Sequence, residues 1–223
     1  MSLEEYRKKR DFRATPEPAG DKPHASGSGK LIYAIQKHEA TRLHYDLRLE
    51  WNGVLLSWAT PKGPSLDPSV KRFAVRTEDH TVDYAKFEGV IPSGEYGAGT
   101  VMVWDEGTWV PDGPDVDANL RKGDLKFTLH GKKLKGSWVL VRTRGYGRSS
   151  WLLIKHRDAF ASERDITTEE PDSAGSRRSL AQIAKDDGGD PQKAAAGYPV
   201  RKARGAVRAK PARARSRRSK AKR

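Results

Sequence analysis

An alternation of polar and apolar residues across residues 43–51, LHYDLRLEW, limits the possible folds more than any other feature. The even positions are His44, Asp46, Arg48 and Glu50, and the odd positions are all apolar. A period of two places successive side chains on opposite faces of a β-strand. One face therefore packs on a core, while the other carries an imidazole, a carboxylate and a guanidinium. Because burying three unpartnered ionisable groups is costly, we expect this face to be wet or to hold a ligand.

Short apolar or alternating runs continue along residues 30–161 and are divided by turn residues. The Asn-Gly pair after the first strand predicts a tight hairpin, and WDEGTW predicts a second turn. All six tryptophans fall between residues 51 and 151, which places the packed core there. The pattern predicts an all-β fold, an antiparallel barrel or sandwich of about eight strands. VIPSGEYGAG is interpreted as a structural loop, because it lacks the Lys–Ser/Thr pair of a phosphate-binding loop.

Composition divides the chain into four parts. Residues 1–29 are polar and rich in Pro, Gly and Ser, which predicts an extended N-terminal arm over the barrel of residues 30–161. Residues 162–200 are a polar linker in which SLAQIAKD is a candidate short helix with Ser179 as its N-cap. Residues 201–223 are predicted to be a disordered basic tail.

The net charge of +14 is concentrated in that tail, which holds twelve Lys and Arg and no acidic residue. Such a block typically binds nucleic acid phosphates by counterion release, although it can also be a solvated tail without a dedicated partner. The absence of cysteine excludes disulfides and thiolate metal sites. No apolar run is long enough to cross a bilayer, and the N-terminus is too polar for a signal peptide. We therefore expect a soluble intracellular protein.

A third candidate ligand lies six residues before His44. His38 ends the preceding apolar run, and the short EATR connection lets the two runs pair, so that His38 joins His44 and Asp46. A two-His, one-Asp site with open positions suits Mn²⁺ or a similar ion. HEATRLH begins like a zincin motif, but that motif needs His at i and i+4 on a helix. The spacing of six in a strand pattern excludes it.

A second alternating run, RFAVRTEDH, predicts another strand with ionisable groups on one face. A lone His or Glu–Arg pair is usually an ordinary surface feature, but the joint pattern favours a metal–phosphate site. Guanidinium groups beside a metal stabilise a transferring phosphoryl group, and His80 is then a candidate general acid or transition-state donor. The predicted anion pocket contains Arg48, Lys62, Arg72 and Arg76, with Glu78 and His80 beside them.

The segments QKHEATRLHYDLRLEWNGVLLSWATPKGPS and RTEDHTVDYAKFEGVIPSGEYGAGTVMVWDEGTW resemble the 3′-phosphoesterase domain of bacterial DNA ligase D. The resemblance runs from about Tyr6 to Ala161 and implies a β-barrel with manganese-dependent activity on DNA 3′ ends. Family members remove a terminal ribonucleoside to leave a 3′-phosphate, and then hydrolyse that phosphate to leave a 3′-OH. Another divalent transition metal remains an alternative cofactor.

The resemblance also implies roles for individual residues. His38, His44 and Asp46 match the metal ligands. Arg48, Glu78, His80 and Tyr84 are the implied catalytic residues. The substrate-binding set comprises Lys62 and Arg72, together with Arg10, Asp11 and Glu17 of the N-terminal arm; Arg76 is added by the strand pattern alone.

In ligase D this module is fused to ligase and polymerase domains. The sequence has no room for either domain, so we expect a free-standing monomer in the bacterial cytoplasm, associated with the nucleoid. Its expected substrates are DNA primer-templates or broken 3′ ends in non-homologous end joining. A DNA ligase, a polymerase or a Ku-type end-binding protein is an expected partner. Two alternatives remain: a non-catalytic nucleic-acid-binding accessory factor of a ligase, and a hydrolase of small phosphoesters.

Overall fold

The computed structural model describes residues 3–20, 29–143, 147 and 149–196. The predicted basic tail, residues 201–223, lies outside the described residues, as do parts of the predicted arm and linker. None of the described helices is long and apolar enough to cross a membrane.

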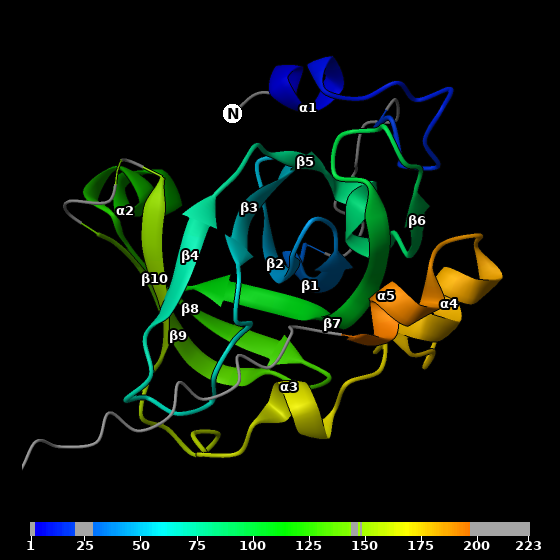
Figure 1. The fold of residues 1–223 in the computed structure, drawn as a ribbon. Coiled ribbons are helices and arrows are strands. Elements are labelled where there is room, and N and C mark those ends of the chain that lie inside the picture. The colour runs from blue at the N-terminus through cyan, green and yellow to red at the C-terminus, as the bar shows by residue number, and fades with distance from the viewer. Residues whose placement is uncertain (1–2, 21–28, 144–146, 148, 197–223) are drawn as a thin grey trace, which may run out of the picture.

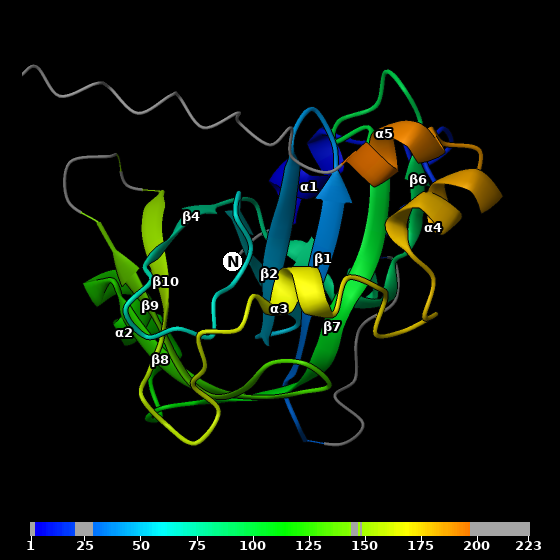
Figure 2. The same ribbon diagram turned by 60° about the horizontal axis from the view of Figure 1, so that its bottom comes forward.

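Eight antiparallel strands close into a barrel, which confirms the predicted fold class (Figures 1 and 2). They follow the order β1-β2-β3-β4-β10-β9-β8-β7, and β7 pairs with β1 to complete the ring. Two short strands, β5 (His80–Thr81) and β6 (Gly89–Ile91), pair with β3 and β7. The barrel strands are β1 (Ile32–Glu39), β2 (Leu43–Trp51), β3 (Val54–Thr60), β4 (Arg72–Arg76), β7 (Gly99–Pro111), β8 (Asp124–Gly131), β9 (Lys135–Arg142) and β10 (Ser150–Lys155).

The turn predicted within WDEGTW is wrong, because β7 runs through it without reversing. Gly107 pairs with Tyr33 of β1 on one side and with Gly131 of β8 on the other. A Cβ atom at Gly107 would lie 2.2 Å from the carbonyl oxygen of His130. The glycine therefore permits a close approach of the neighbouring strand instead of a chain reversal.

Several short helices lie outside the barrel strands. The predicted helix SLAQIAKD is present as α4 (Leu180–Asp186), and Ser179 caps it by accepting a hydrogen bond from the backbone of Gln182. Helix α2 lies beside β8–β10, whereas α4 and α5 lie beside β6 and β7 (Figures 1 and 2). The remaining helices are α1 (Glu4–Lys8), the 3₁₀ helix η1 (Val82–Lys86), α2 (Val116–Lys122), α3 (Ile166–Glu169) and α5 (Pro191–Ala196).

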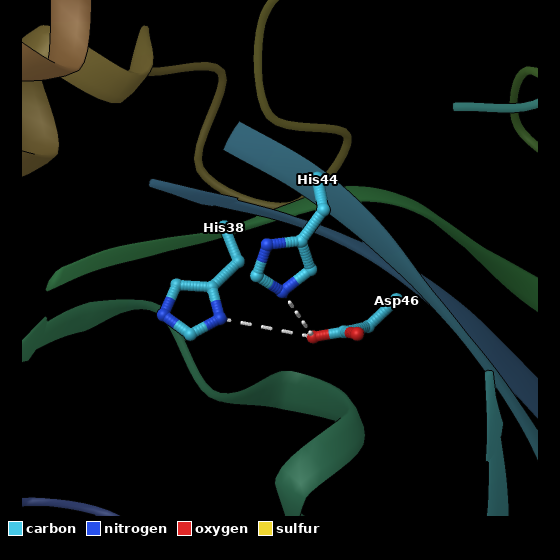
Figure 3. Close-up of side chains that lie close together, drawn as sticks. All are labelled: His38, His44 and Asp46. Carbon is cyan, nitrogen blue, oxygen red and sulfur yellow. Dashed lines mark ion pairs between the residues drawn. The ribbon is translucent and has the colours of Figure 1, made fainter. Parts of the chain in front are cut away.

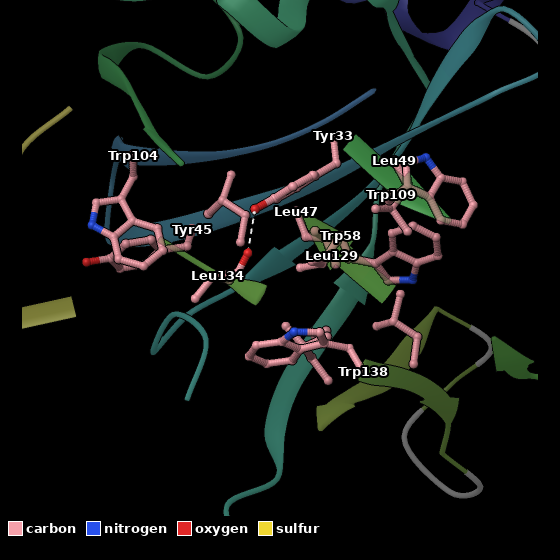
Figure 4. Packing of buried hydrophobic residues seen from close by; sticks show 14 of the residues in the cluster. Tyr33, Tyr45, Leu47, Leu49, Trp58, Trp104, Trp109, Leu129, Leu134 and Trp138 are labelled. Atoms are coloured by element: carbon pink, nitrogen blue, oxygen red, sulfur yellow. Dashed lines mark hydrogen bonds between the residues drawn. The ribbon is translucent and has the colours of Figure 1, made fainter. Parts of the chain in front are cut away.

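The two faces of β2 meet different surroundings. Its apolar side chains enter the main core, a cluster that contains buried residues from all eight barrel strands. Tyr45, Leu47 and Leu49 lie there beside Trp58 and Trp104 (Figure 4). The polar face of β2 points to the other side of the barrel wall. A second, smaller cluster covers part of that side and comprises Tyr6, Ala34, Leu55, Tyr84 and Ala85.

A buried carboxylate joins β1, β7 and the turn before β9. The hydroxyl of Tyr33 donates to Oδ2 of Asp105 at 2.5 Å. The same hydroxyl lies 3.3 Å from the carbonyl oxygen of Leu134 (Figure 4). The backbone N–H groups of Lys133 and Leu134 each donate to Asp105 at 2.9 Å. Burial raises the pKa of Asp105, while these donors oppose that effect.

We predict that Asp105→Asn lowers the free energy of unfolding by about 2–3 kcal/mol, since a buried donor would face the amide NH₂ in either orientation. The measurement is denaturant unfolding, with Glu106→Gln on the partly exposed neighbouring side chain as the control. Equal unfolding midpoints for Asp105→Asn and wild type would contradict the assignment.

Candidate active site

Strands β1 and β2 bring together His38, His44 and Asp46 on the outer side of the barrel wall. The predicted pairing through the short connection is present, with His38 directly opposite His44. Oδ2 of Asp46 lies 3.8 Å from Nδ1 of His38 and 3.6 Å from Nε2 of His44 (Figure 3). One ligand atom from each residue can be chosen so that all three lie within 4.8 Å of one another. The two strands thus present a compact set of three donors.

The other nitrogen of each imidazole is engaged by a backbone carbonyl. Nε2 of His38 lies 2.8 Å from the oxygen of Gly97, and Nδ1 of His44 lies 2.9 Å from that of Arg42. Because a carbonyl only accepts, those nitrogens carry ring hydrogens, and the nitrogens that face Asp46 are the ones that can take a proton or a metal ion. Two oriented imidazole nitrogens and one carboxylate oxygen fit a divalent transition metal, and the carbonyls supply the outer support typical of histidine ligands.

Opposing effects set the protonation of this cluster. Burial alone would raise the pKa of Asp46, but Arg48 and the two histidines hold it well below its usual range. Burial alone would lower the pKa of His44, but Asp46 reverses this effect and raises it. Asp46 is therefore a carboxylate at neutral pH, and a proton competes with any cation for Nε2 of His44.

Arg48 is 3% exposed and is held from three directions. Its guanidinium donates to Gln36 Oε1 at 2.6 Å, to Ser57 Oγ at 2.9 Å and to Asp46 Oδ2 at 3.2 Å. Gln36 also donates to the carbonyls of Tyr84 and Phe87 at 2.9 Å, so it links Arg48 to η1. Sequence reasoning missed Gln36, although it lies two residues before His38 and therefore on the same strand face.

The predicted strand RFAVRTEDH is divided into β4 and β5. Arg76 pairs with Trp58, and His80 pairs with Leu55. Between these two pairs there are three residue steps along β3 but four along the segment from Arg76 to His80. One extra residue reverses which face each later side chain occupies. Arg72 and Arg76 consequently lie on the strand face that carries the core residue Ala74, whereas His80 lies on the site face.

These arginines and Lys62 do not line the pocket that contains His38 and His44. Arg76 is paired with Asp79, donates to the carbonyl of Ser57 at 3.0 Å and lies over the ring of Trp58 at 4.7 Å. Nε of Arg72 is buried without a hydrogen-bond partner in the described part of the chain. Lys62 is exposed.

The N-terminal arm places Arg10 in the site. Its Nε donates to Glu17 at 2.8 Å, and its Nη1 lies 3.4 Å from Glu78. Glu17 is 4% exposed and also accepts a 2.9 Å hydrogen bond from the hydroxyl of Tyr84. Burial, together with the charge of Glu17, raises the pKa of Tyr84, so that hydroxyl keeps its proton. Asp11, by contrast, is exposed and accepts from the backbone of Arg13.

A pocket of about 250 Å³ unites these groups. It lies between the outer side of the barrel wall, the N-terminal arm and the loop that precedes β7. Two guanidinium groups and three potential metal ligands therefore face one small volume. Its polar and aromatic lining comprises Arg10, His38, His44, Asp46, Arg48, Thr77, Glu78, His80, Tyr84 and Tyr96.

His80 is neutral in this arrangement. Its Nε2 lies 3.3 Å from a nitrogen of Arg10, which can only donate, so Nε2 must accept. Its Nδ1 lies 2.9 Å from the carbonyl oxygen of Glu78 and donates to it. Burial, with Arg48 and Arg10 nearby, lowers the pKa of His80 well below its usual value. The ring thus has no proton at Nε2, where the predicted general acid would need one.

Comparison with known proteins finds a family model and several relatives that are similar to this chain. The family model described as the DNA ligase D 3′-phosphoesterase domain matches residues 36–142. The multifunctional non-homologous end joining protein LigD of Pseudomonas aeruginosa is 55% identical over 182 residues, which cover 80% of this chain and 22% of that protein. The non-homologous end joining DNA repair protein LigD of Mycobacterium tuberculosis (strain H37Rv) is 46% identical over 143 residues, which cover 64% of this chain and 18% of that protein. The chain therefore spans about a fifth of the length of these curated relatives.

We predict that His80 makes stability depend on pH below about 6.5, the usual histidine pKa. The unfolded imidazole binds a proton there and the folded one does not, so the free energy of unfolding falls as pH falls, by up to about 1.4 kcal/mol per unit. Urea unfolding at pH 7.5, 6.5 and 5.5 measures this slope, which should shrink in His80→Gln. The exposed His130→Gln is the control; an unchanged slope in His80→Gln would contradict a neutral His80.

Proposed function

The chain belongs to the DNA ligase D 3′-phosphoesterase domain family, and on that premise we propose that it is a metal-dependent phosphoesterase of DNA 3′ ends. It would remove a 3′-terminal ribonucleoside to leave a 3′-phosphate, and then hydrolyse that phosphate to a 3′-OH. The observation that carries the proposal is the convergence of three metal-ligand atoms and two buried guanidiniums on one pocket. Arranged side by side, these are the groups that phosphoryl transfer requires.

His38, His44 and Asp46 would hold the metal, with Mn²⁺ as the proposed ion and another divalent transition metal as the alternative. When bound, such an ion polarises a phosphoryl oxygen and lowers the pKa of a water molecule. The carbonyls of Gly97 and Arg42 keep both imidazole lone pairs directed into the site. The chain therefore supplies ligands that need little rearrangement to accept the ion.

The charge balance of the pocket supports a metal requirement. The guanidiniums of Arg10 and Arg48 face the carboxylates of Asp46, Glu17 and Glu78. Lys9 also pairs with Glu78, so without a cation the carboxylates and the side-chain cations balance, and the pocket offers a phosphate no net positive charge. A divalent cation makes the pocket net positive, so that the two guanidiniums can act on the phosphate oxygens.

The remaining groups position the arginines. The ring of Tyr84 lies 4.7 Å from the guanidinium carbon of Arg48, and its hydroxyl holds Glu17, which in turn holds Arg10. Neutral His80 accepts a hydrogen bond from Arg10 and so orients it toward the pocket. We propose this orienting role for His80 in place of proton donation.

Five predicted substrate-binding residues lie outside the pocket lining: Lys62, Arg72, Arg76, Asp11 and Glu17, of which Glu17 contacts the pocket residues Arg10 and Tyr84. Their contacts with DNA stay predictions. The proposed substrates are primer-templates and broken DNA 3′ ends in non-homologous end joining. The proposed partners are a DNA ligase, a polymerase or a Ku-type end-binding protein, with the protein itself a monomer in the bacterial nucleoid.

We predict that His44→Ala and Asp46→Ala abolish conversion of a 3′-phosphate to a 3′-OH, because each removes a metal ligand. The assay uses the purified protein, Mn²⁺ and a 5′-labelled primer-template, with products resolved on a denaturing gel. His130→Ala, an exposed histidine outside the pocket, is the matched control. Full activity in both ligand variants would refute the metal site. It would also shift weight to the accessory-factor hypothesis, which deletion of residues 201–223 then tests.

A second prediction concerns Arg48. Lysine keeps the charge but has no planar fork, so it cannot serve Gln36, Ser57 and Asp46 at once while facing a phosphate. We expect Arg48→Lys to lower kcat/KM by about 10²–10³-fold. Arg164→Lys on the surface is the control. Wild-type kcat/KM in Arg48→Lys would show that charge alone suffices there.

A further inference from the structure

An exposed aromatic ring stands at the pocket. Tyr96 is 48% exposed, although its side chain lines the same cavity as the candidate metal ligands. Three other large hydrophobic residues are similarly exposed in the described part of the chain, and none of them lines this cavity. These three are Phe73, Val110 and Phe160.

The loop that carries Tyr96 is tied directly to the candidate metal site. It connects β6 to β7 and contains two turn hydrogen bonds, from Glu95 N–H to the Pro92 carbonyl at 3.2 Å and from Ala98 N–H to the Glu95 carbonyl at 3.0 Å. Gly97, the residue after Tyr96, accepts the 2.8 Å hydrogen bond from His38. The position of the Tyr96 ring is therefore coupled to that of a metal-ligand candidate.

The N-terminal arm also holds the ring. Nζ of Lys9 lies 4.8 Å from the ring centroid, and the guanidinium carbon of Arg10 lies 5.5 Å from it. Both cations are anchored on Glu78, at 3.2 Å and 3.4 Å. These contacts favour one ring position, so the exposed part of Tyr96 is a preorganised surface and not a freely rotating side chain.

We propose that Tyr96 stacks on the nucleobase of the 3′-terminal nucleotide whose phosphate enters the pocket. This inference rests on the proposed function and names a further part of its substrate site. The phosphate reaches the buried arginines, so the attached nucleoside must lie toward the exposed part of the cavity, where Tyr96 stands. Base–aromatic stacking accepts every base because each base has a π-face. An end-processing site requires such tolerance, since broken ends differ in sequence.

A purely supporting role makes a different prediction. If Tyr96 only shields the ion pairs of Lys9 and Arg10 with Glu78, its loss weakens binding of the phosphate group itself. That loss would be the same whether or not the terminal nucleotide carries a base. If Tyr96 stacks on the base, its loss matters only when the base is present.

The test measures the Kd of a 5′-fluorescein single strand by anisotropy in Mn²⁺, and the strand carries a non-hydrolysable 3′-methylenephosphonate in place of the 3′-phosphate. The terminal nucleotide is either intact or an abasic tetrahydrofuran analogue. Tyr96→Ala should weaken binding of the intact strand by about 5- to 100-fold, and binding of the abasic strand by less than about twofold. Wild type should itself bind the abasic strand more weakly, by a similar factor. Tyr96→Phe should restore base-dependent binding, and Phe160→Ala, which is exposed outside the cavity, should match wild type.

Equal losses for the intact and abasic strands, or no loss for either, would overturn the inference. Hydrolysis by the wild type is measured in parallel on the matching intact strand with a true 3′-phosphate. Base-dependent binding without hydrolysis would support the stacking subsite while contradicting the proposed phosphoesterase. Hydrolysis with base-independent binding would do the reverse.

Discussion

The carboxylate of Asp46 is the charge around which the site is organised. A buried carboxylate without partners would take up a proton, and its burial would be costly. Here Arg48 donates to the carboxylate at 3.2 Å, and imidazole nitrogens of His38 and His44 lie 3.8 Å and 3.6 Å from the same oxygen. Because these groups hold the pKa of Asp46 low, it remains an anion and keeps a cation-binding potential. The pairing of β1 with β2 fixes all four side chains relative to one another.

The site has two halves of different origin. Barrel strands supply the candidate metal ligands, whereas the N-terminal arm brings Arg10 and Glu17 to the segment that contains Glu78, His80 and Tyr84. Because Arg10 and Glu17 are both buried, their hydrogen bonds are strong and an unpaired partner would be destabilising. The arm is thus part of the candidate site, and its docking couples the guanidinium of Arg10 to Glu78 and His80.

Local sequence pattern predicted the barrel and the His38–His44–Asp46 cluster, because alternation and a short connection fix both the strand face and the pairing. The same reasoning did not foresee the extra residue between β4 and β5, which puts Arg76 and His80 on different faces. Such a shift depends on long-range pairing with β3 and leaves no local signal. The turn predicted in WDEGTW is wrong for a related reason: its glycine permits the close approach of the neighbouring strand, which the local sequence does not reveal. The prediction that Arg10 belongs to the site came from the family resemblance, not from the periodicity of the sequence.

The proposed metal site holds one divalent cation on His38, His44 and Asp46 beside Arg48. An anomalous difference map from a crystal soaked in Mn²⁺ and phosphate would locate such an ion. We expect one strong anomalous peak at bonding distance from Nδ1 of His38, Nε2 of His44 and Oδ2 of Asp46, with phosphate density between that peak and Arg48. A map with no peak at these three atoms, or with the dominant peak elsewhere on the protein, would contradict the proposed site.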